Sequence, residues 1–217
     1  MIFGKIEYLN LLPFHVFMKR YVKGSQQRHI LHYKRGVPSQ INEAFKARRI
    51  DAAFISSIAS KRCRCTNLGI LSRKEVHSVL LLPGKNKTDD ESATSNVLAK
   101  VLGLNGEVLI GDKALRHHLT HDDTAIDLAK VWYEQQNLPF VFARLCHHGK
   151  NKKYQKLSKK FLASSHKIPF YLLDKASKRT DIQRNDILDY LKLIEYKIDR
   201  HAELSLKRFL RLADTLS

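Results

Sequence analysis

The sequence has no long apolar run, and this shortage limits where the protein can act. No apolar segment approaches the roughly 18 residues that a membrane-spanning helix needs. The N-terminal residues from Met1 to Glu7 contain no basic leader followed by an apolar block and a small-residue cleavage site. We therefore expect no secretion signal, no membrane partner and a cytoplasmic location.

Cysteine is also scarce, with Cys63, Cys65 and Cys146 as the three examples. Cys63 and Cys65 are closer together than the pairs of a zinc ribbon, and there is no second close pair to complete four ligands. The odd number predicts reduced thiols. Neighbouring histidines, as at 117–118 and 147–148, point about 100° apart on a helix and do not readily share an ion. The sequence predicts no metal site.

Acidic residues are few, 21 against 39 lysines and arginines, so the formal net charge is +18 at pH 7. Such a charge attracts nucleic acids and also small polyanions. The basic residues run from Lys5 to Arg211 and are densest between Lys150 and Lys160. No signature of an RNA-binding domain, a zinc finger or a helix-turn-helix accompanies them. We therefore expect no nucleic-acid partner, and attraction of a small anion is the alternative use of the charge.

A stretch in the first quarter of the chain combines a helix start with a buried strand. Pro38 and Ser39 suit the opening of a helix, where the Ser39 hydroxyl can cap free backbone N–H groups. The apolar run 50–55 is typical of a strand covered on both faces, and Ser56 and Ser57 end it. Parallel strands that end in hydroxyls are where open α/β sheets bind anions. The stretch therefore predicts either an anion site or ordinary helix capping.

The same chemistry recurs near the middle of the chain, which favours the anion site. Thr94 and Ser95 belong to a hydroxyl-rich helix start. The short strand 108–110 ends in Gly111, where the backbone can approach a ligand, followed by Asp112. Strands in the first half and the middle, with helices between them, predict an α/β fold of two lobes around a cleft.

Two segments are expected to connect the lobes. The polar stretch from Lys85 to Glu91 lacks apolar periodicity and predicts a crossing into the second lobe. The apolar segment 138–143 is expected to carry the chain back. Residues 1–83 with 144–217 would then form the first lobe, and residues 84–143 an inserted second lobe.

Several motifs follow one another in a fixed order: Tyr8-Leu9-Asn10 with Leu12-Pro13; Gly36-Val37-Pro38-Ser39 with Asp51 and Ile55-Ser56-Ser57; Glu91-Ser92-Ala93-Thr94-Ser95; and Ile110-Gly111-Asp112 with Ala114-Leu115. This ordered set resembles the chorismate dehydratases of the futalosine route to menaquinone. The resemblance implies a type II periplasmic-binding-protein-like fold and the conversion of chorismate to 3-[(1-carboxyvinyl)oxy]benzoate by loss of water, with no metal or organic cofactor. The polar 85–90 stretch and the short 103–107 connection depart from the family pattern and imply a trimmed second lobe.

Chorismate has two carboxylates, which helix starts with hydroxyl side chains are suited to bind. The expected substrate-binding residues are Ser39, Ser56, Ser57, Thr94, Ser95 and Gly111. Asn10 is expected to orient the leaving hydroxyl or a carboxylate of the substrate. Asp112 is a candidate base for the ring C3 proton, although a helix-capping role suits it equally. The alternative base is the enolpyruvyl carboxylate of the substrate itself.

Other functions fit parts of the pattern. A non-catalytic protein of the same fold would bind a small carboxylate without turning it over. A nucleic-acid-binding protein would use the positive charge. A sister enzyme that makes 1,4-dihydroxy-6-naphthoate shares the fold, but its characteristic N-terminal motif is not seen here. The sequence does not indicate the oligomeric state.

Overall fold

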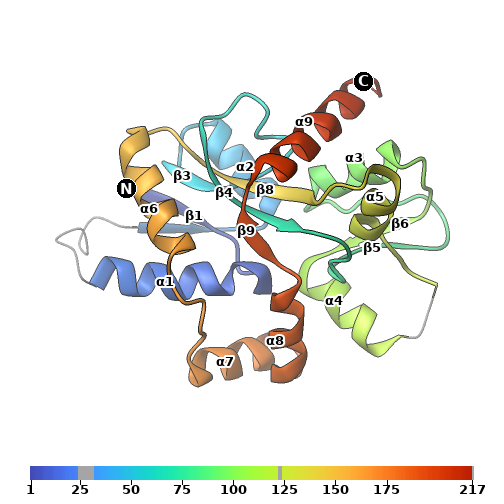
Figure 1. Ribbon diagram of the computed structural model, residues 1–217. Helices are drawn as coiled ribbons and strands as arrows, with labels where there is room; N and C mark the ends of the chain where they lie inside the picture. Colours follow the sequence, from blue (N-terminus) through green and yellow to red (C-terminus); the bar gives the residue numbers. More distant parts are fainter. Residues whose placement is uncertain (24–31, 122–123, 217) are drawn as a thin grey trace.

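The computed structural model describes residues 1–23, 32–121 and 124–216, and its two β-sheets define two lobes (Figure 1). The strands of the first sheet are, in spatial order, β2 (His32–Arg35), β1 (Ile2–Lys5), β3 (Ala52–Ser56), β8 (Phe140–His147), β4 (Cys65–Ser72) and β9 (Glu195–Lys197). Those of the second sheet are β6 (Glu107–Ile110), β5 (Val79–Leu82) and β7 (Ile126–Asp127).

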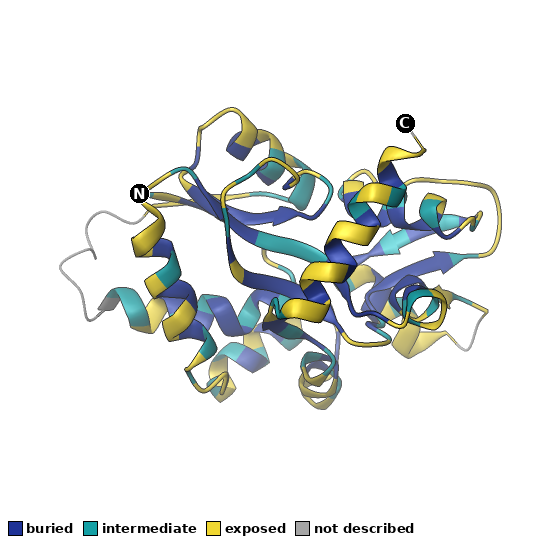
Figure 2. Ribbon diagram, turned by 45° about the horizontal axis from the view of Figure 1, so that its top comes forward, coloured by how far each residue is buried: buried dark blue, intermediate teal, exposed yellow. Residues whose placement is uncertain are grey.

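Helices cover both sheets, with their buried residues facing inward and their exposed residues facing solvent (Figure 2). They are the 3-10 helix η1 (Leu9–Leu11) and the α-helices α1 (Leu12–Lys23), α2 (Pro38–Lys46), α3 (Ala93–Val101), α4 (Gly111–Thr120), α5 (Leu128–Gln136), α6 (Asn151–Leu162), α7 (Phe170–Thr180), α8 (Arg184–Lys192) and α9 (Arg200–Asp214). Within the described ranges, none of them is long and apolar enough to cross a membrane.

The centre of the first sheet is buried on both faces, as its sequence predicts. Every residue of β3 is buried, because its small and branched apolar side chains pack on either side of the sheet. β1 is parallel to β2 and β3, whereas β8 runs antiparallel between β3 and β4. The chain therefore leaves this sheet and returns into its middle. The returning strand places Ala143 opposite Ser56, at the carboxyl end of β3.

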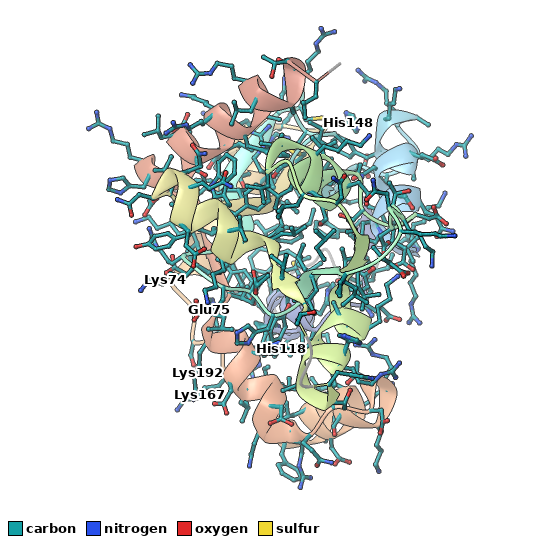
Figure 3. The ribbon with its side chains drawn as sticks, turned by 90° about the vertical axis from the view of Figure 1, so that its right-hand side faces the viewer. Lys74, Glu75, His118, His148, Lys167 and Lys192 are labelled. Carbon is teal, nitrogen blue, oxygen red and sulfur yellow. A yellow bond between two sulfur atoms is a disulfide. The ribbon has the colours of Figure 1, made fainter. Side chains whose placement is uncertain are left out.

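The lobes are divided differently from the predicted ranges 1–83 with 144–217 and 84–143. β5 pairs with β6, so the chain is already in the second lobe at Val79. The crossing lies between β4 and β5, on the stretch that carries Lys74 and Glu75 (Figure 3). The return lies between α5 and β8, because the whole of β8 pairs with strands of the first sheet. Both boundaries between the lobes are therefore determined by which strands pair with each other, and not by the local polarity of the sequence.

Helix α9 connects the two lobes through an aromatic contact. Trp132 of α5 is fully buried, with its ring centroid 5.4 Å from that of Phe140 and 6.0 Å from that of Phe209 on α9. Its indole Nε1 donates to Ser205 Oγ of α9 at 3.0 Å, which satisfies the one polar atom of the ring. The C-terminal helix therefore stabilises the orientation of the second lobe.

Two of the cysteines differ from the sequence prediction. Cys65 of β4 and Cys146 of β8 lie directly opposite each other and form a disulfide, with their Cα atoms 4.0 Å apart. Residues opposed across antiparallel strands are close in space, although these two are 81 positions apart in the sequence. The prediction of reduced thiols is therefore wrong for this pair, while Cys63 is a free thiol.

Candidate active site

A cavity of about 80 Å³ lies between the two lobes. Apolar side chains from both sheets form much of its wall, among them Phe54 and Ile70 from the first lobe and Val79 and Ile110 from the second. Its polar side chains are those of Tyr8, Asn10, Ser56, Ser78, Ser92 and Ser95. Among the described residues that line it, none is charged. The cavity is suited to a small molecule with an apolar ring and polar substituents.

Several helices begin at residues that line this cavity. Asn10 lies in η1, Pro38 opens α2, Ser92 is the N-cap of α3, and Gly111 opens α4. The first N–H groups of a helix lack intrahelical partners and carry partial positive charge. Their convergence favours an anionic ligand without any lysine or arginine in the wall.

Ser56 is held in the wall by an asparagine that the sequence does not single out. Asn42 of α2 donates from Nδ2 to Ser56 Oγ at 2.6 Å, and its Oδ1 accepts from the Ser56 N–H at 3.2 Å. Because the Ser56 oxygen accepts from Asn42, the hydroxyl keeps its own hydrogen for a ligand. In the sequence, this pair of hydrogen bonds is signalled only by the polar character of Asn42, about one turn into α2.

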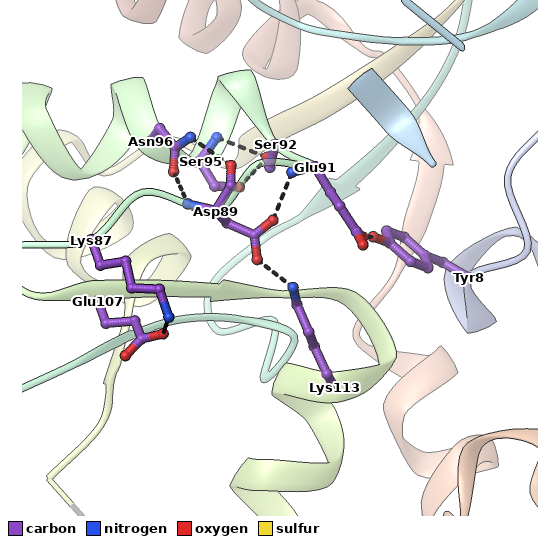
Figure 4. A network of polar contacts seen from close by, with 9 residues as sticks. All are labelled: Tyr8, Lys87, Asp89, Glu91, Ser92, Ser95, Asn96, Glu107 and Lys113. Carbon is purple, nitrogen blue, oxygen red and sulfur yellow. Dashed lines mark hydrogen bonds and ion pairs between the residues drawn. The ribbon is translucent and has the colours of Figure 1, made fainter. Parts of the chain in front are cut away.

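Ser95 lies in the opposite wall, as its predicted role requires, and a second serine orients it (Figure 4). Ser92 Oγ accepts from the Ser95 N–H at 3.1 Å and donates to Ser95 Oγ at 2.8 Å. The hydrogen of the Ser95 hydroxyl therefore remains available to the cavity. Ser92 belongs to the hydroxyl cluster recognised in the sequence. It is the N-cap of α3 and lines the cavity, so we include it in the candidate site.

Tyr8 forms one side of the cavity and joins the lobes, because its hydroxyl donates to the Glu91 carboxylate (Figure 4). Gly111 makes room for the ring: a Cβ there would lie 2.8 Å from Tyr8 Cζ. Its φ of +69° is also in the region that glycine tolerates best. Burial and the bond to Glu91 raise the pKa of Tyr8, so the phenol stays a donor. Gly111 itself lines the cavity, directly after β6.

A buried carboxylate fixes the segment that carries Glu91. The side chain of Asp89 is only 2% exposed, and it forms an ion pair with Lys113 at 2.7 Å. Its Oδ1 accepts from the Glu91 N–H at 2.9 Å, while its backbone N–H and C=O both bond to the amide of Asn96 (Figure 4). The partner of Tyr8 is therefore held on a rigid segment.

Asn10 lines the cavity and is held from behind by a tyrosine. Its backbone oxygen accepts from the Tyr196 hydroxyl at 2.8 Å. Ser78 is a second polar residue in the cavity wall, and its Oγ lies 2.9 Å from the phenol oxygen of Tyr190.

Asp112 lies outside this cavity, beside a neighbouring surface pocket. Its Oδ1 accepts from the Leu9 N–H at 2.8 Å, and its Oδ2 forms an ion pair with Arg179 at 2.9 Å. Burial raises the pKa of Asp112, and the Leu9 N–H and the Arg179 guanidinium oppose that rise. Both oxygens therefore hold α4 against η1 and α7.

Three other predicted binding residues are not among those that line the cavity. Ser57 is fully buried, and its hydroxyl donates to a β8 carbonyl oxygen at 2.5 Å. Thr94 Oγ1 accepts from the Ile58 N–H at 3.2 Å, which joins the lobes. Ser39 is the second residue of α2, whose N-cap is Val37, so the prediction that Ser39 caps this helix is wrong.

The histidines of the paired positions make aromatic contacts. His118 stacks on His77 with ring centroids 4.1 Å apart, and His148 stacks on Phe45 with ring centroids 4.0 Å apart. Figure 3 labels His118 and His148. In the part of the chain that the structure describes, no three His, Cys, Asp or Glu side chains are grouped as metal ligands.

Solved structures similar to this one show its fold. A protein of Archaeoglobus fulgidus has a TM-score of 0.74 at 13% identity, over 99% of this chain and 97% of that one. A Candida albicans protein described as having the generic periplasmic binding protein fold has a TM-score of 0.58 at 12% identity, over 100% and 90%. The predicted two-lobed, periplasmic-binding-protein-like α/β fold is confirmed.

Sequence relatives identify the family. A curated chorismate dehydratase of Campylobacter jejuni is 44% identical over 221 residues, which cover 100% of this chain and 99% of that protein. The family model described as "Menaquinone biosynthesis" matches residues 1–107 and 99–215. The chain therefore belongs to the menaquinone biosynthesis family.

Proposed function

We propose that this protein is a chorismate dehydratase, a lyase that removes water from chorismate to give 3-[(1-carboxyvinyl)oxy]benzoate in menaquinone biosynthesis. The observation that carries the proposal is the 44% identity, over the full length of both chains, to a curated enzyme of that name. The cavity supports it, because apolar walls suit the ring and converging helix N-termini suit the two carboxylates.

The two lobes divide the binding task. Ser92 and Ser95 at the start of α3 would bind one carboxylate, and Ser56 with the turn that follows β3 would bind the other. The ring would then lie between Phe54 and Ile110, with water excluded. Asn10 would contact the leaving hydroxyl or the enolpyruvyl carboxylate from the remaining side.

The reaction breaks the C3–H and C4–O bonds and yields an aromatic ring and one water, with no net oxidation or reduction. Aromatisation supplies the driving force, so the enzyme must chiefly position the substrate. We infer that the enolpyruvyl carboxylate takes the C3 proton and delivers it to the departing hydroxide. The uncharged lining of the cavity and the engaged oxygens of Asp112 support this substrate-assisted route.

Asp112→Asn tests this choice of base. The amide keeps an acceptor for the Leu9 N–H and loses only the charge that pairs with Arg179, so kcat should stay within about threefold of the wild type. The partly exposed ion pair contributes at most about 1 kcal/mol, so thermal unfolding should shift only slightly. A loss of about 100-fold or more in a normally folded variant would restore the aspartate as the base.

The proposed function is tested by incubating metal-stripped protein with chorismate and following the ultraviolet spectrum and the product mass. We expect chorismate to disappear and a product lighter by one water to form. Chorismate that stays intact but raises the unfolding temperature would instead indicate a non-catalytic carboxylate-binding protein. Chorismate that does neither would contradict both.

We further propose that the enzyme works in the cytoplasm, in the futalosine route, and that it needs no cofactor. The redox-neutral elimination supports the last point, because no electron acceptor is required. The enclosed position of the cavity between the lobes and its uncharged lining support a small-molecule substrate rather than a nucleic acid, whose phosphates are bound by lysine and arginine.

A further inference from the structure

Tyr190 of α8 lies directly behind the cavity and takes no part in the chemistry derived so far. It is 4% exposed and does not itself line the cavity. Its phenol oxygen lies 2.9 Å from Ser78 Oγ. One buried hydroxyl therefore contacts a polar group that does line the cavity.

The protonation of this phenol limits how the two hydroxyl groups can bond. Burial raises the pKa of Tyr190, so it holds its proton and has a single hydrogen to donate. Because a phenol is more acidic than an aliphatic hydroxyl, the phenol is the donor in its contact with Ser78 Oγ. Ser78 then keeps its own hydrogen for the cavity.

We propose that Tyr190 is a positioning residue for the dehydration, which orients the Ser78 hydroxyl as a donor towards the substrate hydroxyl that leaves. No proton is transferred from Tyr190, because the departing hydroxide receives the C3 proton through the substrate. The inference rests on the proposed function, which it deepens by naming a group at the leaving hydroxyl.

Tyr190→Phe removes only the phenol oxygen, and we expect it to lower kcat roughly 10- to 100-fold with KM for chorismate changed less than threefold. Ser78→Ala should lower kcat to a similar extent. The double variant should be no slower than Ser78→Ala alone, because Tyr190 acts through Ser78. Tyr154→Phe is the control: it removes another buried phenol oxygen, 3.6 Å from Met1 Sδ and remote from the cavity, and should keep the wild-type kcat.

The outcomes separate the inference from the proposed function. A wild-type protein without turnover would overturn both, whereas an active wild type with a fully active Tyr190→Phe overturns the inference alone. Independent, multiplied losses in the double variant would also overturn it, since they indicate general packing. If Tyr190→Phe does not fold, Ser78→Ala decides, and wild-type kcat in that variant refutes the inference.

Discussion

Replacing Asn10 with alanine is expected to lower kcat for chorismate by about 100-fold while the protein stays folded. The amide is the polar side chain that η1 places in the cavity, and its backbone is fixed independently by Tyr196. Removing one pre-oriented group that contacts the charge of a transition state typically costs about 100- to 1,000-fold in kcat. Steady-state kinetics and a thermal unfolding curve measure both parts of the expectation.

Two further variants make the Asn10 experiment specific. Asn10→Asp keeps the shape but adds a negative charge to a site for anions, so KM should rise in addition to the fall in kcat. Asn105→Ala removes an asparagine whose Oδ1 accepts from Asn86 on the surface of the second lobe, and it should leave both constants unchanged. Wild-type turnover in Asn10→Ala would contradict a catalytic role for this residue.

Local sequence patterns predict the fold well because burial on both faces leaves a clear signal. The apolar run that ends at Ser56 forms β3, and the hydroxyl cluster before Val97 opens α3. The lobe edges were missed because composition does not tell which sheet a strand joins. β5 reads as one more apolar strand, and only its pairing with β6 places it in the second lobe.

The candidate site is harder to predict, because neighbouring residues of the same type face different surroundings. Ser56 and Ser57 are adjacent, yet Ser56 lines the cavity and Ser57 donates to a β8 carbonyl oxygen. Successive residues at the end of a strand point in opposite directions, so one hydroxyl faces the ligand and the other faces the core. Of two adjacent serines at the end of a strand, we therefore expect only one hydroxyl to face a ligand.

The groups that orient the site are the ones that sequence reasoning missed. Ser78 and Tyr190 are separated by 112 positions, and Leu9 and Asp112 by 103. No motif shows that such residues meet. Asp112 has the local pattern of a candidate base at a helix start, but its two oxygens contact the distant Leu9 N–H and Arg179 guanidinium.

Gly111→Ala is expected to lower kcat/KM for chorismate by about 100-fold. The new Cβ would lie 2.8 Å from Tyr8 Cζ, so the ring must move, and with it one side of the cavity and the bond to Glu91. A displacement of about 1 Å in a positioned group can cost about 100-fold in rate. The left-handed φ of +69° adds a cost of about 1–2 kcal/mol to the free energy of unfolding.

Gly103→Ala separates the contact from the backbone strain. Gly103 follows α3 with the same φ of +69°, but no atom lies within 4 Å of the position that a Cβ would take there. Both variants should therefore lose about 1–2 kcal/mol of stability through the backbone, and only Gly111→Ala should lose activity. Equal activity in the two would mean that the position of the Tyr8 ring is unimportant for turnover. Because the strain is matched, any difference in kcat/KM reports the contact between Gly111 and Tyr8.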